Sequence, residues 1–226
     1  MKKEILSKQY NNVAGEFEKV FGKMNEKSVV ALNNALATLL TERIKNAIDL
    51  GSGLGDMIQY LKSKNITCAG VDSSSEMVEK ARLSTNADIR CEDFANTSFE
   101  SNSFDLITSK WAMQTSKEIA PIYNEASRLL KKNGYFVFLV VHPLRQFLEK
   151  KKQGKDYFKK EIVDSIIFDG AITVQEPSHT LMEYLGKGFS KYFSLIDINE
   201  GAEFPAAEQI GGDNYPTYLI IVAQKK

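Results

Sequence analysis

The sequence has few of the residues that would place it in a special environment. Only two residues are cysteine, Cys68 and Cys91, and they have neither CxxC spacing nor histidine neighbours at metal-site spacing. We therefore expect two reduced thiols and no metal centre. No apolar run approaches the roughly 18 residues that a membrane helix needs. These absences predict a cytoplasmic protein without a membrane partner.

An excess of charge of either sign is also absent. Lysine and arginine total 29, as do aspartate and glutamate, so the formal net charge is zero. Such a chain has no overall field that recruits nucleic acid, and we expect no nucleic-acid partner. Hydrophobic residues make up 43% and charged residues 26%, which is typical of a globular protein. A length of 226 residues favours one large domain.

Helical patterns come first in the chain, followed by an alternation of strands and helices. Residues 1–44 repeat apolar positions at helical spacing, as in Val13, Phe17 and Val20. Short apolar runs then alternate with helical segments, at 47–50, 67–71, 89–91, 104–108 and 135–141. Near-continuous apolar strands separated by helices predict a parallel sheet covered on both faces. Ligands of such sheets bind beyond the carboxyl ends of the strands.

This alternation breaks between about residues 144 and 176. The segment has a basic stretch and then two β-rich runs, 162–168 and 171–174, joined by Asp169-Gly170. An Asp-Gly pair between β-rich runs is a hairpin signal. An insertion that follows the fifth strand must emerge at the ligand edge, so we expect a hairpin lid over that edge.

The remaining residues complete the sheet in this interpretation. A helical pattern over 180–188 precedes two β-rich runs, 192–198 and 218–223, which could pair antiparallel at the sheet edge. We therefore expect a single domain made of four parts, namely a helical cap 1–44, a core 45–143, an inserted lid 144–176 and a C-terminal part of the same sheet 177–226.

A glycine-rich loop, Gly51-Ser52-Gly53-Leu54-Gly55, joins the first strand to its helix. Glycine adopts unusual dihedrals and leaves no Cβ between the main chain and a ligand, so a cofactor could lie against the loop. A dinucleotide fingerprint would place its third glycine at Asp56, where an acidic side chain faces pyrophosphate unfavourably. The loop therefore favours a nucleoside cofactor without phosphate over NAD.

An acidic residue, Asp72, ends the second strand. A carboxylate at that position can accept hydrogen bonds from two ribose hydroxyls. Ser73 and Glu76 have capping-box spacing, which predicts that the next helix starts there. The structural alternative is a strand-to-helix turn followed by a helix-capping aspartate.

Five segments resemble, in order, the motifs of class I S-adenosylmethionine-dependent methyltransferases: AIDLGSGLG, GVDSSSEMVEKAR, CEDF, SFDLITSKWAMQ and LLKKNGYFVFLVVHP. The resemblance covers about residues 45–143. It implies an α/β, Rossmann-like fold with a mainly parallel seven-stranded sheet, helices on both faces, N-terminal helices and the inserted hairpin. It also implies S-adenosylmethionine as cofactor, S-adenosylhomocysteine as product and a small-molecule methyl acceptor.

The resemblance implies roles for individual residues as well. The methionine and ribose part of the cofactor would lie along the glycine loop, Asp72 would hold the ribose, and Asp93 with Phe94 would meet the adenine. Tyr10 could close over the cofactor, although a core or surface position is equally compatible. The expected cofactor-binding residues are Tyr10, Asp49, Gly51, Ser52, Gly53, Asp72, Ser73, Asp93, Phe94 and Ser109.

Methyl transfer from a sulfonium is an in-line displacement that needs alignment and exclusion of water, but no metal. A poorly acidic substrate also needs a base. The only two histidines, His142 and His179, both fall on the expected ligand side. They are the candidate catalytic residues, with His142 preferred. In the structural alternative, His142 hydrogen-bonds the turn before Pro143 and His179 caps a helix.

Two other functions remain open on the sequence. An NAD-dependent oxidoreductase is disfavoured by Asp56 and by the lack of a suitably placed Tyr-x-x-x-Lys. A catalytically silent S-adenosylmethionine-binding protein would have no deep substrate cavity, and the predicted hairpin argues against it. The sequence leaves open which substrate is methylated, on which element, and in which oligomeric state the protein acts.

Overall fold

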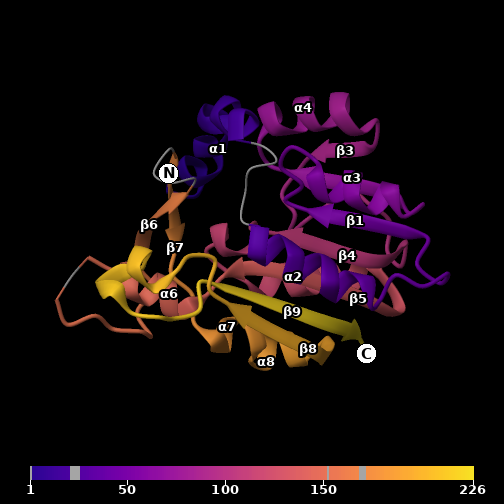
Figure 1. Ribbon diagram of the computed structural model, residues 1–226. Helices are drawn as coiled ribbons and strands as arrows, with labels where there is room; N and C mark the ends of the chain where they lie inside the picture. Colours follow the sequence, from indigo (N-terminus) through magenta and orange to yellow (C-terminus); the bar gives the residue numbers. More distant parts are fainter. Residues whose placement is uncertain (1, 21–25, 152, 168–171) are drawn as a thin grey trace.

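The computed structural model describes residues 2–20, 26–151, 153–167 and 172–226. Its strands form a seven-stranded sheet of order β3-β2-β1-β4-β5-β9-β8 and a two-stranded sheet, β6-β7 (Figure 1). The strands are β1 Asn46–Leu50, β2 Thr67–Asp72, β3 Asp88–Cys91, β4 Phe104–Lys110, β5 Leu130–Val141, β6 Ile162–Ile167, β7 Ile172–Pro177, β8 Phe193–Gly201 and β9 Tyr218–Lys225.

Eight α-helices and three short 3₁₀ helices occur in the described part of the chain. The α-helices are α1 Lys2–Val20, α2 Glu26–Ala37, α3 Asp56–Ser63, α4 Ser75–Thr85, α5 Ala120–Leu129, α6 Pro143–Glu149, α7 Leu181–Leu185 and α8 Lys187–Ser190. The 3₁₀ helices are η1 Met113–Thr115, η2 Ala206–Glu208 and η3 Ile210–Gly212. None of the helices within these described ranges is long and apolar enough to cross a membrane.

The large sheet has the mixed topology that the strand pattern predicts. Strands β1 to β5 run parallel to one another, whereas β9 pairs antiparallel with both β5 and β8. The predicted antiparallel pair of final strands is therefore confirmed. The chain moves outward from β1 to β3 and then returns to place β4 on the other side of β1. Parallel sheets bind ligands at such a reversal of strand order, beyond the carboxyl ends of the strands.

Two hydrophobic cores cover the two faces of this sheet. Phe136, Phe138 and Val140 of β5 pack with α5, α7 and α8, whereas Val137 and Leu139 pack with α2 and α3. This alternation follows from the two-residue period of a strand. Because both faces bury apolar side chains, inner strands such as β9 are almost continuously hydrophobic, and the predicted helices on both faces are confirmed.

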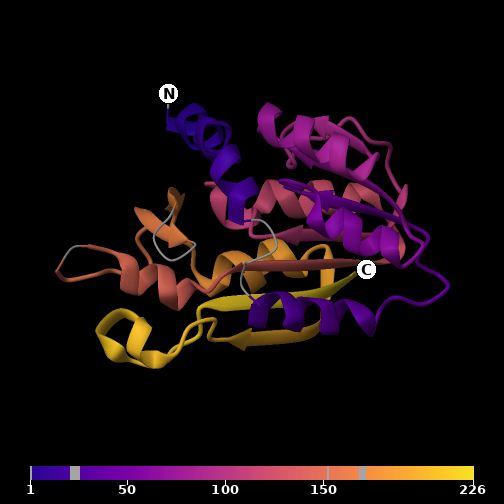
Figure 2. The same cartoon turned by 45° about the horizontal axis from the view of Figure 1, so that its top comes forward.

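Helix α1, helix α6 and the β6–β7 hairpin gather at the end of the sheet to which β1 points (Figures 1 and 2). The side chain of Gln9 joins α1 to the hairpin, because its Nε2 donates to the Gln175 carbonyl at 3.0 Å and its Oε1 accepts from the Gln175 amide at 2.9 Å. The predicted inserted hairpin is confirmed by the paired strands, while its turn, Asp169-Gly170, lies outside the described residues.

Three local details differ from the sequence interpretation. Helix α4 is capped by Ser74, whose Oγ accepts from the Met77 amide at 3.2 Å, so the expected cap at Ser73 is wrong by one residue. The basic stretch after strand β5 begins with helix α6, where Pro143 occupies the first turn. The helix predicted over 180–188 is two short helices separated at Gly186.

Candidate functional site

The loop between β1 and α3 turns sharply at the carboxyl edge of the sheet. The amides of Gly51 and Ser52 both donate to the Val71 carbonyl, at 2.8 and 2.9 Å, so the loop is tied to β2. Gly51 has φ of 77°, and a Cβ there would lie 2.2 Å from Ala112 Cβ. Only glycine fits this close approach, because an L side chain would meet both strain and a clash.

Gly53 is required for a different reason. Its φ is 50°, yet a Cβ added there would meet no protein atom within 4 Å. The side of Gly53 where a Cβ would project therefore faces open space rather than the core.

The Asp72 carboxylate is held by backbone groups. The Gly53 amide donates to Asp72 Oδ2 at 2.9 Å, and the Ser74 amide donates to Asp72 Oδ1 at 2.9 Å. Two backbone donors thus fix the Asp72 carboxylate, while burial raises the pKa of that carboxyl.

Asp49 lies deeper in the same edge and is 2% exposed. Thr108 Oγ1 donates to Asp49 Oδ1 at 2.7 Å, and burial raises the pKa of Asp49 to about 7. Burial also lowers the pKa of Lys110, at the end of β4, to about 8. Lys110 Nζ forms an ion pair with Asp56 at the start of α3. A cationic ligand group beside Asp49 would therefore favour its ionised form.

Three buried polar atoms at this edge have no hydrogen-bond partner among the described residues: Ser52 Oγ, Trp111 Nε1 and Gln114 Oε1. Buried polar groups are almost always satisfied, so unpaired ones in a native structure need an explanation. All three side chains line one cavity. A polar ligand in the cavity would supply the missing partners.

This cavity has a volume of about 610 Å³ and opens at the carboxyl edge of the sheet. Cofactors and small ligands occupy pockets of this size. Its walls come from α1, α2, the β1–α3 loop, the ends of β2 and β4, η1, α6 and the hairpin. Eight of the ten expected cofactor-binding residues line it, namely Tyr10, Asp49, Gly51, Ser52, Gly53, Asp72, Ser73 and Phe94.

The other two expected cofactor residues are not part of the cavity lining. Ser109 is buried, and its Oγ donates to the Leu50 carbonyl at 2.8 Å, so it joins β4 to β1. Asp93 is an exposed residue beside Phe94, and its Oδ1 accepts from the Ala95 amide at 2.9 Å. The adenine contact expected of Asp93 stays a prediction, while Ser109 reaches the protein backbone rather than the cavity.

His142 also lies outside the cavity lining, although its neighbour Val141 belongs to it. The ring caps helix α6, because Nδ1 accepts from the Leu144 amide at 3.1 Å. Nε2 lies 3.0 Å from Glu200 Oε2 of β8. Burial lowers the pKa of His142, although Glu200 acts in the opposite direction. Both ring nitrogens therefore have protein partners, which favours the structural alternative.

His179 is 2% exposed and packs behind the cavity wall. Its Nε2 donates to the Gln114 carbonyl at 3.1 Å, and its amide donates to Gln146 Oε1 at 2.9 Å. Glu183 Oε2 lies 3.5 Å from Nδ1. His179 thus supports the segment that carries Gln114 and does not itself line the cavity. Neither candidate base from the sequence is brought to the cavity.

Tyr10 of helix α1 lines the cavity. Burial raises the pKa of the Tyr10 hydroxyl well above its usual value, and the carboxylates of Glu176 and Asp72 raise it further. Asp72 ends β2, Glu176 belongs to the hairpin, and both line the same cavity as Tyr10. Helix α1 is held to the core by Ser74 Oγ, which donates to Asn11 Oδ1 at 2.6 Å.

The sequence interpretation missed the residues that the insertion contributes. Arg145 of α6 and Ser165, Val174 and Glu176 of the hairpin all line the cavity. The signal that could have found Glu176 is the two-residue period of β7, in which buried Val174 and Glu176 alternate with exposed Gln175. A buried carboxylate on the apolar face of a strand is unusual. One that also lies over the ligand edge is a candidate functional residue.

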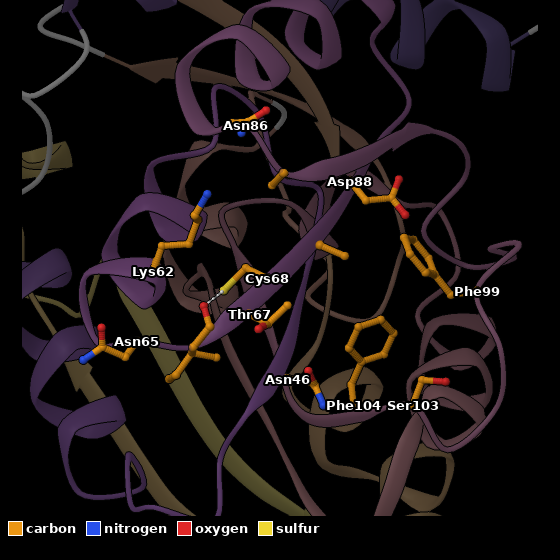
Figure 3. Close-up of a pocket in the computed structure, with 13 residues that line it drawn as sticks. Asn46, Lys62, Asn65, Thr67, Cys68, Asn86, Asp88, Phe99, Ser103 and Phe104 are labelled. Carbon is orange, nitrogen blue, oxygen red and sulfur yellow. Dashed lines mark hydrogen bonds between the residues drawn. The ribbon is translucent and has the colours of Figure 1, made fainter.

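A second hollow, of about 760 Å³, lies at the opposite edge of the sheet, where the strands begin (Figure 3). Two of its polar groups have protein partners: Cys68 Sγ donates to the Ile66 carbonyl at 3.4 Å, and Lys62 Nζ donates to the Thr85 carbonyl at 2.6 Å. Burial raises the pKa of the Cys68 thiol to about 12, which makes it unreactive. The ligand edge is therefore the better candidate site.

Known proteins resemble both the sequence and the fold. A family model described as a methyltransferase domain matches residues 48–138. The ubiquinone/menaquinone biosynthesis C-methyltransferase UbiE of Campylobacter jejuni is 26% identical over 222 residues, covering 89% of this chain and 91% of the relative. The biotin biosynthesis bifunctional protein BioHC of Saccharophagus degradans is 28% identical over 150 residues, covering 64% of this chain but only 26% of that protein.

Among solved structures, a putative S-adenosylmethionine-dependent methyltransferase from Listeria monocytogenes shares the fold with a TM-score of 0.69 and 22% identity. The match covers 88% of this chain and 99% of the neighbour. The glycine loop, the acid at the end of β2 and the unpaired polar atoms fit the cofactor of such enzymes. Residues 48–138 therefore form a methyltransferase domain, and the chain has the fold of an S-adenosylmethionine-dependent methyltransferase.

Proposed function

We propose that this methyltransferase transfers the methyl group of S-adenosylmethionine to a small molecule that binds in the same cavity. The proposal is supported by one observation: the glycine loop and the elements outside the large sheet line the same cavity. The β1–α3 loop forms one end of the cavity, while α1, α6 and the hairpin add walls from outside the large sheet. One shared space for cofactor and substrate is what a direct methyl transfer requires.

The cofactor would be bound mainly by groups whose positions are fixed by hydrogen bonds to the backbone. Asp72 would accept hydrogen bonds from the ribose hydroxyls, and Asp49 would face the ammonium of the methionine part. The open side of Gly53 would lie against the cofactor, and Ser52 Oγ would gain a partner. Phe94 and Asp93 are proposed for the adenine, and Tyr10 for the closing wall from α1.

The bound cofactor supplies an electrophilic methyl carbon on a sulfonium. The protein then has to align the substrate with that carbon and exclude water. Trp111, Val141 and Val174 give the substrate end an apolar lining, and α1 and the hairpin cover it from outside. No metal participates in this proposal.

Two features support the exclusion of other ligands. Asp56 lines the cavity at the start of α3, where a dinucleotide pyrophosphate would lie, and its charge would repel phosphate. A formal net charge of zero supports a small-molecule substrate over nucleic acid. The name of the UbiE relative also points to small molecules for that protein.

The proposal is tested with S-adenosylmethionine carrying a deuterated methyl group. The enzyme is incubated with a protein-free extract of cellular small molecules, and mass spectrometry searches for products that gain the labelled methyl. We expect at least one labelled product that is absent without enzyme. Cofactor binding, measured by the melting temperature with S-adenosylhomocysteine or NAD, should appear only with the former. Binding without any labelled product would indicate a silent binding protein.

A further inference from the structure

The substrate end of the cavity contains a buried carboxyl group that the cofactor does not account for. Glu176 is 2% exposed and projects from the inner face of β7. Val163 pairs with it in register across the hairpin, and Val174 follows the same face. A carboxyl at such an apolar position is unusual in proteins, because ionised side chains are rarely buried without a charged partner.

The immediate contacts of Glu176 are neutral. Ser165 Oγ donates to Oε2 at 3.0 Å, and Gln114 Nε2 lies 3.4 Å from Oε1. The nearby cation Arg145 instead donates through Nε to Glu149 Oε1 at 2.8 Å. Within the described part of the chain, Glu176 therefore has no ion pair that would commit its charge to the fold.

Trp111 Nε1 is an unpaired donor at this end, whereas the capacity left over around Glu176 is acceptor capacity. Gln114 uses its Nε2 on Glu176, which leaves Oε1 buried without a partner among the described residues. The Glu176 oxygens can each accept a further hydrogen bond. Both groups line the cavity. A substrate that satisfies them must present hydrogen-bond donors, which means N–H or O–H groups.

Charge and apolar area narrow the class of substrate further. Four acidic side chains and two basic ones belong to the described cavity lining, namely Asp49, Asp56, Asp72, Glu176, Lys110 and Arg145. This excess of acids disfavours an anionic substrate. The remaining wall is largely apolar, with Phe17, Val29, Val30, Trp111, Val141 and Val174. The body of the substrate should therefore be uncharged and mainly apolar.

The protonation state of Glu176 suits proton transfer near neutral pH. Burial raises the pKa of Glu176 to about 7, and the hydrogen bond from Ser165 partly opposes this. The charged and titratable groups that act on it are Glu149 and Arg145 of α6, Tyr10 of α1 and Tyr184 of α7. A general base works best when its pKa lies near the working pH.

Resting on the methyltransferase function proposed above, we propose that Glu176 is the general base, and that the substrate is a neutral, largely apolar molecule methylated on an N–H or O–H group. The substrate proton passes to a Glu176 carboxylate oxygen. The electron pair released on nitrogen or oxygen forms the bond to the methyl carbon. The methyl–sulfur bond breaks, and its electrons stay on sulfur, which becomes a neutral thioether.

The test uses the labelled product obtained with deuterated S-adenosylmethionine and the small-molecule extract. Nuclear magnetic resonance of that product should place the labelled methyl on nitrogen or oxygen. Glu176→Gln should keep cofactor affinity but lower kcat by roughly a hundredfold or more, the range for lost general-base catalysis. Asp164→Asn is the matched control, because Asp164 lies on the other face of the same hairpin and pairs with exposed Lys151.

The pH dependence of the unchanged enzyme provides a second measurement that needs no variant. At saturating S-adenosylmethionine, kcat should fall as the pH falls through about 7, because protonated Glu176 cannot accept the substrate proton. Saturation removes the separate effect of Asp49 on cofactor binding. The Glu176→Gln variant should lose this limb, while Asp164→Asn should keep it.

The outcomes separate this inference from the methyltransferase function itself. A labelled product with its methyl on carbon or sulfur would overturn the inference and leave the function standing. Near-native kcat in Glu176→Gln, or a wild-type rate without the limb near pH 7, would do the same. If the unchanged enzyme binds the cofactor but yields no labelled product, the function and the inference both fail.

Discussion

The two ends of the cavity are built in different ways. At the cofactor end, two backbone amides hold the Asp72 carboxylate. One belongs to Gly53 in the β1–α3 loop and the other to Ser74, the N-cap of α4. At the substrate end, Glu176 is held by the side chains of Ser165 and Gln114 from two separate elements. A backbone-held site is fixed by the fold, whereas a side-chain-held site can change with a few substitutions.

The same difference appears in the supports around each end. The glycine loop is tied to β2 within the large sheet. Among the described residues, the two hydrogen bonds between the hairpin and α1 both involve one glutamine side chain, Gln9. On this comparison, we expect substitutions in the insertion to alter the use of the substrate and substitutions in the glycine loop to alter cofactor binding. Substitutions at the two ends should therefore have separable effects.

The largest expected effect is at Asp72. Asp72→Ala should lower the affinity for S-adenosylhomocysteine by roughly a hundredfold or more, because two charge-assisted hydrogen bonds to the ribose are lost. Isothermal titration calorimetry measures the affinity, and the melting temperature checks the fold, since two backbone donors also lose their partner. Asp72→Asn keeps the shape and should show a smaller loss. Unchanged affinity in both variants would rule out this end as the cofactor site.

Gly53→Val sharpens the comparison within the glycine loop. The valine side chain would project into open space, so cofactor affinity should drop at least tenfold while the protein still folds, with the left-handed φ costing about 1–2 kcal/mol of stability. Gly51→Val should instead prevent stable folding, because its Cβ would meet Ala112. Calorimetry and thermal unfolding distinguish the two. Normal binding by Gly53→Val would make the loop purely structural.

A smaller effect is expected where α1 meets the hairpin. Gln9→Ala removes two hydrogen bonds to Gln175, each contributing about 0.5–1.5 kcal/mol. We expect the KM for the methyl-accepting substrate to rise several-fold, with cofactor affinity altered less than twofold. Steady-state kinetics with the identified substrate measures this. A loss of cofactor affinity as large as the change in KM would mean that the two ends are not separable.

The smallest effect is expected at His142. Asparagine is also a good N-cap, so His142→Asn should keep helix α6 and change kcat less than tenfold. The pH–rate profile should retain its limb, because the structure gives both ring nitrogens protein partners. A fall in kcat of a hundredfold or more, with loss of that limb, would restore His142 as the base and displace Glu176 from that role.

The cofactor end could be predicted from the sequence because its determinants are local. The glycines of 51–55 and Asp72 follow directly from apolar strands, and the carboxyl ends of parallel strands meet at one edge. Even there, the helix cap was displaced by one residue, from Ser73 to Ser74. Adjacent serines present the same side chain, and only the backbone turn decides which one accepts the hydrogen bond.

The substrate end could be predicted only in outline. The sequence predicts a hairpin over the ligand edge, but the inward direction of Glu176 depends on the register of β6 and β7. For His142, the expected edge is right, yet the ring direction is set by Glu200, which is 58 residues away in the chain. The alternation within β7 places Glu176 on the face of Val174, whereas the contact that orients His142 joins distant segments, and no local pattern contains it.

The most direct test of the two-ended cavity is a crystal structure with S-adenosylhomocysteine. We expect the ribose hydroxyls within hydrogen-bond distance of Asp72, the amino group near Asp49, and the sulfur facing free space bounded by Trp111 and Glu176. A ligand seated in the hollow at the opposite edge, or one whose sulfur points away from the hairpin, would contradict this account.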